Sequence, residues 1–187
     1  MAICELHRLR LPQISAIISF SREEQETVDQ ISHERQRSNR KGGRTNLKFS
    51  KCDPLEIEKI GTGGEMAFSK WSGLAMDFNT ACRNGGKDGI IYDFRYQGFT
   101  LDVKASRTQV MAVAPYQEKA KVQIYCMMHM CSWMNYYLVG FTSHERLFHP
   151  FTLKPHYDKE HHVLHGSELY ATIQDIPSIT EDDGIPF

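Results

Sequence analysis

The 187-residue chain lacks a long apolar run, a large excess of one charge and any C-x-x-C pair of cysteines. No segment approaches the roughly 20 apolar residues of a membrane-spanning helix, and the N-terminus lacks the apolar segment of a secretory signal peptide. The formal net charge of −1 excludes a global basic field, so a polyanion would need a local patch. The five scattered cysteines are typical of reduced thiols, and together these absences predict a cytoplasmic protein.

The length suits one domain with an appendage, because a single core is expected at this size. We predict an N-terminal arm with a helix over residues 1–50, a core domain over 51–174 and an acidic tail over 175–187. The boundaries follow the shift from the polar, basic-ended N-terminal segment to apolar segments, and then to the acids near the C-terminus.

Two long helices are expected, with a short one starting near Thr142 to Glu145. Ser21 and Glu24 form a capping box, with serine at the N-cap and glutamate three residues later, so a helix should run to about Asn39 or Lys41. A second helix is predicted over 64–81, with Glu65 in its first turn. Its apolar positions repeat at helical spacing and should face a sheet: Ala67, Trp71, Leu74, Ala75 and Phe78.

The segment 92–104 predicts two short strands joined by a Gln97-Gly98 turn. Side chains alternate along a strand, so Asp102 and Lys104 share one face while Leu101 and Val103 share the other. A two-residue turn places Asp93 directly opposite Asp102, with Cβ atoms about 4.5–5.5 Å apart.

Two carboxylates at that separation repel each other unless a cation lies between them. Mg²⁺ prefers carboxylate oxygens, so Asp93 and Asp102 are candidate metal ligands and the Val103 carbonyl is a further one. Lys104 would hold a water or stabilise charge that develops on a phosphoryl oxygen. The ordinary alternative is an edge hairpin with a cross-strand salt bridge at the surface.

Tyr92-Asp93-Phe94 followed by Leu101-Asp102-Val103-Lys104 resembles the core of the PD-(D/E)XK nuclease superfamily. Gly61-Thr62-Gly63-Gly64-Glu65-Met66-Ala67 is similar to the start of that family's preceding helix, so the resemblance implies Glu65 as a third carboxylate. It covers roughly residues 60–141. No proline precedes Asp93, a departure from the pattern that leaves Asp88 as a rival first carboxylate.

The resemblance implies an α/β fold with a restriction-endonuclease-like core, in which helices flank a mixed central sheet. It makes residues 51–174 a nuclease domain that hydrolyses DNA phosphodiester bonds with Mg²⁺, for which Mn²⁺ can substitute. The residues implied for catalysis are Asp93, Asp102, Lys104 and Glu65. Endonuclease and exonuclease action are not distinguished, and neither are the substrate structure and the oligomeric state.

A local basic patch is expected at the end of the first helix, where cations would contact DNA phosphates. Alternatively, these cations simply complement the helix dipole. Residues just after Lys104 also suit phosphate contacts. The candidate DNA-binding residues are Arg35, Arg37, Arg40, Lys41, Arg44, Lys48, Ser106 and Arg107.

Two buried strands are predicted over 122–130 and 136–141, followed by a segment, 144–165, that holds six histidines. We predict a solvated loop there. A zinc site is conceivable, but no histidine pair stands at the helical spacing of a zinc protease with its glutamate.

The C-terminal residues Glu181 to Phe187 resemble the acidic tip of bacterial single-stranded-DNA-binding proteins, apart from an extra Gly184. The resemblance implies docking on a replication or repair enzyme, with acids steering an apolar plug. Its partner-binding residues would be Asp182, Asp183, Ile185, Pro186 and Phe187. The alternative is a disordered terminus of chance composition.

Two other functions therefore stand beside the nuclease. The chain could be a catalytically inert protein of nuclease fold that binds a replication or repair enzyme, or DNA, and uses its tail. It could also bind nucleic acid without turnover, in a manner sensitive to salt and independent of metal.

Overall fold

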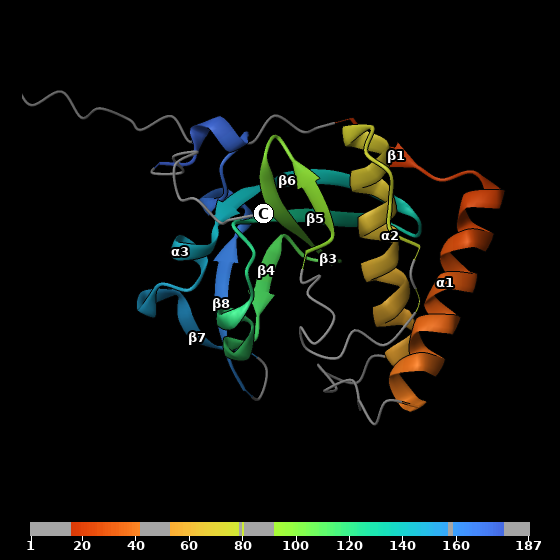
Figure 1. Ribbon diagram of the computed structural model, residues 1–187, viewed down its shortest axis with the longest axis horizontal. Helices are drawn as coiled ribbons and strands as arrows, with labels where there is room; N and C mark the ends of the chain where they lie inside the picture. The colour runs from red at the N-terminus through yellow and green to blue at the C-terminus, as the bar shows by residue number, and fades with distance from the viewer. Residues whose placement is uncertain (1–15, 42–52, 79, 81–91, 157–158, 178–187) are drawn as a thin grey trace, which may run out of the picture.

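A mixed five-stranded sheet lies at the centre of the computed structural model, which describes residues 16–41, 53–78, 80, 92–156 and 159–177 (Figure 1). Strands β3 and β5 are parallel, while all other neighbours are antiparallel. The predicted α/β class, the mixed sheet and the two buried strands are confirmed. In spatial order the strands are β1 (Ile18–Ser19), β6 (Asn135–Ser143), β5 (Ile124–Ser132), β3 (Phe99–Ser106) and β2 (Phe94–Tyr96).

The β2–β3 hairpin has the predicted turn and register. Phe94 pairs with Leu101 and Tyr96 with Phe99, and the φ angles of Gln97 and Gly98 are 49° and 86°. Two successive left-handed residues match the right-handed twist of the flanking strands. Continuing this register by one residue places Asp93 opposite Asp102, at the end of the ladder.

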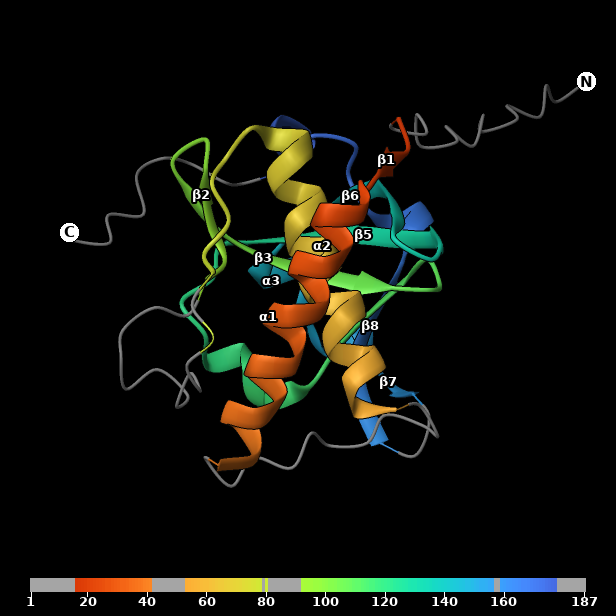
Figure 2. The ribbon, with the colours of Figure 1, turned by 90° about the vertical axis from the view of Figure 1, so that its right-hand side faces the viewer.

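Helix α1 (Arg22–Lys41) begins at the predicted capping box. The Ser21 N–H donates to the Glu24 carboxylate at 2.7 Å, and the Glu24 N–H donates to Ser21 Oγ at 3.3 Å. The helix lies against α2 (Pro54–Ser72) on the side away from the sheet (Figures 1 and 2). It buries only two apolar side chains, Val28 and Ile31, so polar contacts make up much of this helix pair.

Helix α2 begins at Pro54 and ends at Ser72, so both of its ends come well before the predicted ends at 64 and 81. Asp53 caps it, since its Oδ1 accepts the Leu55 N–H at 3.1 Å, and Pro54 takes the first helical position, as both residue types favour. The C-cap is Gly73, whose φ of 75° is the left-handed conformation typical of a helix end.

The prediction was wrong because the glycine-rich segment lies inside α2 and not at its start. Glu65 therefore occupies the middle of the helix. Of the expected apolar stripe, Ala67 is buried against the sheet, whereas Phe78 lies beyond the helix and is 58% exposed. Trp71 packs on Phe68, Tyr96 and Phe141.

The glycines bring α2 unusually close to the sheet. A Cβ on Gly64 would lie within 3.0 Å of the Ala105 Cβ, and one on Gly63 would meet the Tyr136 hydroxyl. A Cβ on Gly61 would meet nothing within 4 Å. The packing of α2 on β3 and β6 thus depends on the two inner glycines.

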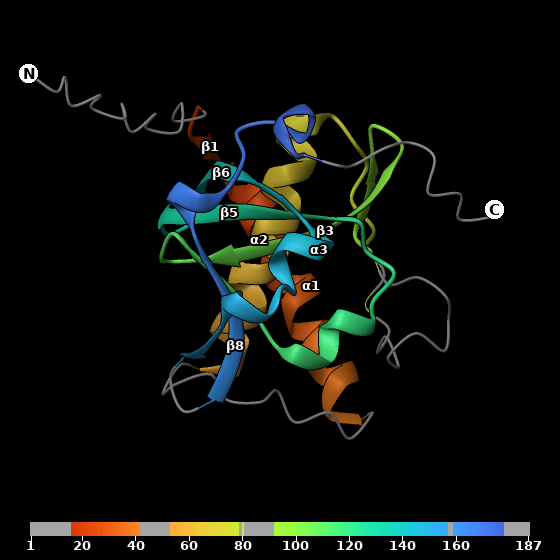
Figure 3. The ribbon, with the colours of Figure 1, turned by 90° about the vertical axis from the view of Figure 1, so that its left-hand side faces the viewer.

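A second, three-stranded sheet packs on the opposite face of the central sheet (Figure 3). Its order is β4 (Val110–Val113), β8 (Lys159–His165) and β7 (Leu153–His156). The core beneath it is formed largely by Met111, Tyr125, Met127 and Leu164. Single 3₁₀ turns cover Pro115–Lys119, Pro150–Thr152, Gly166–Glu168 and Ile173–Asp175.

The histidine-rich segment was wrongly predicted to be a solvated loop. It forms α3 (His144–Leu147), a 3₁₀ turn and the β7–β8 hairpin. His161 and His162 are buried; His162 Nδ1 lies 2.9 Å from Thr152 Oγ1, and its ring packs edge-on against Phe148. Histidine therefore fills core positions that the apolar pattern could not reveal.

Among the described residues, no helix has both the length and the apolar character needed to cross a bilayer. The described cysteines, Cys126 and Cys131, are free thiols, the first buried and the second exposed.

Replacing Gly64 with alanine should destabilise the protein by about 2 kcal/mol, because the new methyl group overpacks a rigid Cβ contact. Gly61→Ala is the matched control and should stabilise it by about 1 kcal/mol through helix propensity. Denaturant unfolding of both variants measures the difference. Equal effects would show that close approach does not constrain α2.

Candidate active site

Strand β3 places Asp102 and Lys104 on the face that lies away from α2. Leu101 and Val103 face the core beneath α2, so the predicted alternation holds. The Lys104 ammonium forms an ion pair with Asp102, and their side chains are only 25% and 15% exposed. The ammonium also lies 5.8 Å from the ring centre of Tyr125, on the parallel neighbour β5. A charged pair is thus held at the boundary of the second core.

Asp93 joins this pair from the end of β2. Its Oδ2 accepts the Val103 N–H at 2.8 Å, which replaces the next ladder bond and fixes the carboxylate at the edge of β3. The Asp93 carboxyl lies near enough to Asp102 to raise the pKa of Asp102. Because the N–H and C=O of a strand residue point to the same side, the Val103 carbonyl points beyond the end of β2 as well.

The electrostatics of the site follow from burial and from this carboxyl pair. Burial raises the pKa of Asp102 to about 7, and Asp93 adds to the rise while the attraction of Lys104 opposes it. Burial acts against a charge on Lys104, but the nearby Asp102 carboxylate raises the pKa of Lys104 overall. The site therefore holds a cation readily and a second full negative charge only at a cost.

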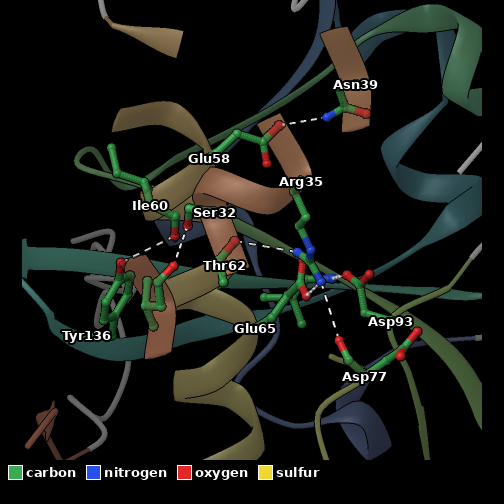
Figure 4. A network of polar contacts seen from close by, with 12 residues as sticks. Ser32, Arg35, Asn39, Glu58, Ile60, Thr62, Glu65, Asp77, Asp93 and Tyr136 are labelled. Carbon is green, nitrogen blue, oxygen red and sulfur yellow. Dashed lines mark hydrogen bonds and ion pairs between the residues drawn. The ribbon is translucent and has the colours of Figure 1, made fainter. Parts of the chain in front are cut away.

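Arg35 and Glu65 lie beside this cluster and bind each other. Arg35 reaches down from α1, and its two terminal nitrogens donate to the two Glu65 oxygens at 2.8 Å each. Both side chains are only 14% exposed. Figure 4 shows Asp93 facing the same guanidinium group. Burial acts against the Arg35 charge, yet Glu65 and Asp93 raise its pKa.

This geometry changes two sequence predictions. Glu65 was expected in the first turn of its helix as a metal ligand, and Arg35 was expected to contact DNA phosphates. Instead, Glu65 lies in the middle of α2 with both oxygens bonded to Arg35, whose guanidinium is turned inward. Sequence reasoning missed this pair because it depends on how α1 crosses α2, for which no local pattern exists.

The other candidate DNA contacts are dispersed. Arg37, Arg40 and Lys41 are exposed near the end of α1. Arg107 forms an ion pair with Glu56, and Ser106 Oγ lies 3.1 Å from Thr108 Oγ1. The remaining predicted residues fall outside the part of the chain that the structure describes: Arg44, Lys48, the rival carboxylate Asp88, and the tail residues Asp182, Asp183, Ile185, Pro186 and Phe187.

Within the described ranges, no group of three or more His, Cys, Asp or Glu side chains is arranged to hold a metal ion. Asp93, Asp102 and the Val103 carbonyl nevertheless offer three oxygens at one edge of β3. Mg²⁺ keeps several waters and is usually bound by one or two carboxylates, so this smaller donor set fits it. The described histidines supply no comparable zinc site.

A model of DUF5843, a family of unknown function, matches residues 10–139. The chain belongs to this family. The DUF5843 match includes both the Arg35–Glu65 pair and the cluster of Asp93, Asp102 and Lys104, whereas β7 and β8 follow it. Searches of curated proteins and of solved structures found no significant match.

The raised pKa of Asp102 gives the DUF5843 protein a specific pH dependence in metal-free buffer. A carboxyl group whose pKa rises on folding stabilises the fold at low pH and loses that contribution as pH rises from 3.8 to about 7. Between pH 5 and 7 the wild type should therefore lose about 1 kcal/mol per pH unit relative to Asp102→Asn. Urea unfolding with EDTA at each pH measures this, and parallel curves would contradict it.

Proposed function

We propose that this DUF5843 protein is a metal-dependent nuclease that hydrolyses DNA phosphodiester bonds with Mg²⁺ as cofactor. The observation that carries the proposal is the gathering of three groups at one edge of β3: Asp93, held by the Val103 N–H, and Asp102, ion-paired with Lys104. Two neighbouring, partly buried carboxyl groups are stable together only when a proton or a cation reduces their repulsion. The order of hairpin, parallel strand and covering helix supports a restriction-endonuclease-like core.

Asp93 and Asp102 would hold the cation, with the Val103 carbonyl as a third protein oxygen. Glu65 is left out of this set because both of its oxygens bond to Arg35. When bound, Mg²⁺ lowers the pKa of a coordinated water and neutralises charge on a phosphoryl oxygen.

Lys104 would be the charge-stabilising group. Its raised pKa keeps the ammonium protonated at neutral pH. Because Lys104 shares a strand face with Asp102, the ammonium would lie beside a phosphate bound to the cation. A fixed ammonium stabilises the negative charge that develops on phosphate oxygens during water attack. The partial burial of the group strengthens this interaction, because the local dielectric constant is lower than in water.

DNA would approach through local charge. The net charge is −1, so the protein as a whole does not attract a polyanion. Arg37, Arg40 and Lys41 are exposed along the last turns of α1, the same helix that carries Arg35 to the site. These cations would contact the DNA backbone, which predicts salt-sensitive binding.

The proposal predicts that Lys104→Ala and Asp102→Asn each lower the rate of DNA cleavage at least about 100-fold, the usual cost of removing a group that stabilises transition-state charge. Lys154→Ala, an exposed lysine on β7, is the matched control and should cleave like the wild type. Purified proteins are incubated with plasmid and with linear DNA, with Mg²⁺ or with EDTA.

Cleavage that survives in Lys104→Ala and in Asp102→Asn at the wild-type rate would exclude this site as its source. Cleavage by no protein, on either DNA and with Mg²⁺ or Mn²⁺, would refute the nuclease proposal itself.

A second candidate function is binding without turnover. It is favoured by the Arg35–Glu65 pair, which occupies the carboxylate expected as a third ligand, and by the lack of a three-residue metal group in the described part of the chain. The protein would then bind DNA, or a replication or repair enzyme through its C-terminal residues.

Deletion of residues 182–187 separates the two functions. If the protein is a nuclease, cleavage persists without these residues. If it is a binding protein, cleavage is absent throughout, and the deletion abolishes capture of a purified replication or repair enzyme. DNA binding that is insensitive to EDTA and weakens steeply with salt would indicate binding through phosphates alone.

A further inference from the structure

Arg35 is held on several sides at the edge of the proposed metal site. Its two nitrogens donate to Glu65 at 2.8 Å, and the Thr62 hydroxyl and the Asp77 carbonyl lie at 3.5 and 3.4 Å. Asp93 faces it from the sheet (Figure 4). These contacts come from α2, from the segment that follows it and from the start of the hairpin, so the guanidinium has one fixed position.

A divalent ion could reach Glu65 only by displacing this guanidinium. The bidentate arrangement uses both carboxylate oxygens, and it is the strongest geometry for a pair of this kind. Both partners are 14% exposed, so separating them would leave a buried charge without its partner, which is strongly unfavourable. The space between Glu65 and Asp93 is thus already taken by a positive charge that the chain supplies.

We infer that Arg35 replaces a second cation in this cluster, so that the site binds one divalent ion, at Asp93 and Asp102, and Glu65 serves to anchor Arg35. This inference rests on the proposed function, because it assumes that the carboxylate pair binds metal. Arg35 is a positioning residue in this scheme. It neutralises Glu65 and balances part of the charge on Asp93, so that Asp93 and Asp102 together bind a single ion.

The test counts bound ions in the full-length protein with Mn²⁺ as the probe, by titration calorimetry and by loss of the free-ion signal in electron paramagnetic resonance. The wild type should bind one Mn²⁺. Arg35→Met frees Glu65 and should bind two, with the first held about tenfold more tightly, a typical size for a changed group beside metal ligands.

Two further variants control the result. Arg35→Met combined with Glu65→Gln removes both charges and should return to one Mn²⁺ with an affinity close to that of the wild type. Lys59→Met breaks a different α1–α2 ion pair, in which Lys59 Nζ lies 2.8 Å from Asp29 Oδ1, and should leave the count at one. Circular dichroism checks that each variant is folded. If Arg35→Met alone fails to fold, the Mn²⁺ affinity of the double variant, compared with that of the wild type, tests whether Glu65 is a metal ligand.

The outcomes separate the inference from the function on which it rests. A wild type that binds no Mn²⁺ would refute the metal site itself. Two ions in the wild type, or one in a folded Arg35→Met variant, would overturn the role of Arg35 and leave the nuclease proposal standing. A tenfold or greater loss of affinity in the double variant would show that Glu65 is a metal ligand, and would also overturn it.

Discussion

The buried ion pair between Arg35 and Glu65 is the interaction on which the arrangement of the candidate site depends. A charge that is mostly removed from water must be paired and hydrogen-bonded. Here Arg35 donates to both Glu65 oxygens and makes further contacts with Thr62 and Asp77. Because Arg35 comes from α1 and Glu65 from α2, the pair fixes how one helix crosses the other. The remaining contacts between the helices are largely polar: Lys70 with Glu24, Lys59 with Asp29, and Asn39 with Glu58.

The position of Glu65 depends in turn on the glycines before it. Gly63 and Gly64 let the α2 backbone approach Tyr136 and Ala105 at distances that a Cβ would forbid. Glycine in a helix interior costs about 1 kcal/mol relative to alanine. The two glycines therefore reduce the stability of α2 as a helix, but they allow it to pack closer to the sheet. That closeness is what brings a residue of α2 to the end of β2, where Asp93 lies.

The parts of the structure that the sequence predicts well are those set by neighbours in the chain. The Gln97-Gly98 turn fixes the hairpin register, and side-chain alternation places Asp102 and Lys104 on one face. The capping box at Ser21 fixes the start of α1 in the same way. In each case the structure is determined by residues only a few positions apart in the sequence, so their local hydrogen bonds and backbone preferences are sufficient to predict it.

Prediction fails where packing between distant segments decides. The glycine-rich segment of α2 has poor helix propensity, and tertiary contact with β3 and β6 overrides it. His161 and His162 are polar by composition, yet both are buried on β8, because an imidazole with a hydrogen-bond partner packs as an aromatic ring does. The meeting of Arg35 with Glu65 likewise has no signature in either local sequence.

The charge balance of the site connects its packing to the proposed chemistry. Arg35 and Glu65 neutralise each other, so the neighbouring group of Asp93, Asp102 and Lys104 carries one net negative charge when all three are ionised. Burial makes that charge unfavourable, and the pKa of Asp102 rises to about 7 in response. A proton removes the excess charge, and so does a divalent cation, which replaces it with a net positive charge suited to a phosphodiester. Under the proposed function, a site that exchanges a proton for a metal near neutral pH, beside a lysine on the same strand, would supply the electrostatic stabilisation that phosphodiester hydrolysis requires.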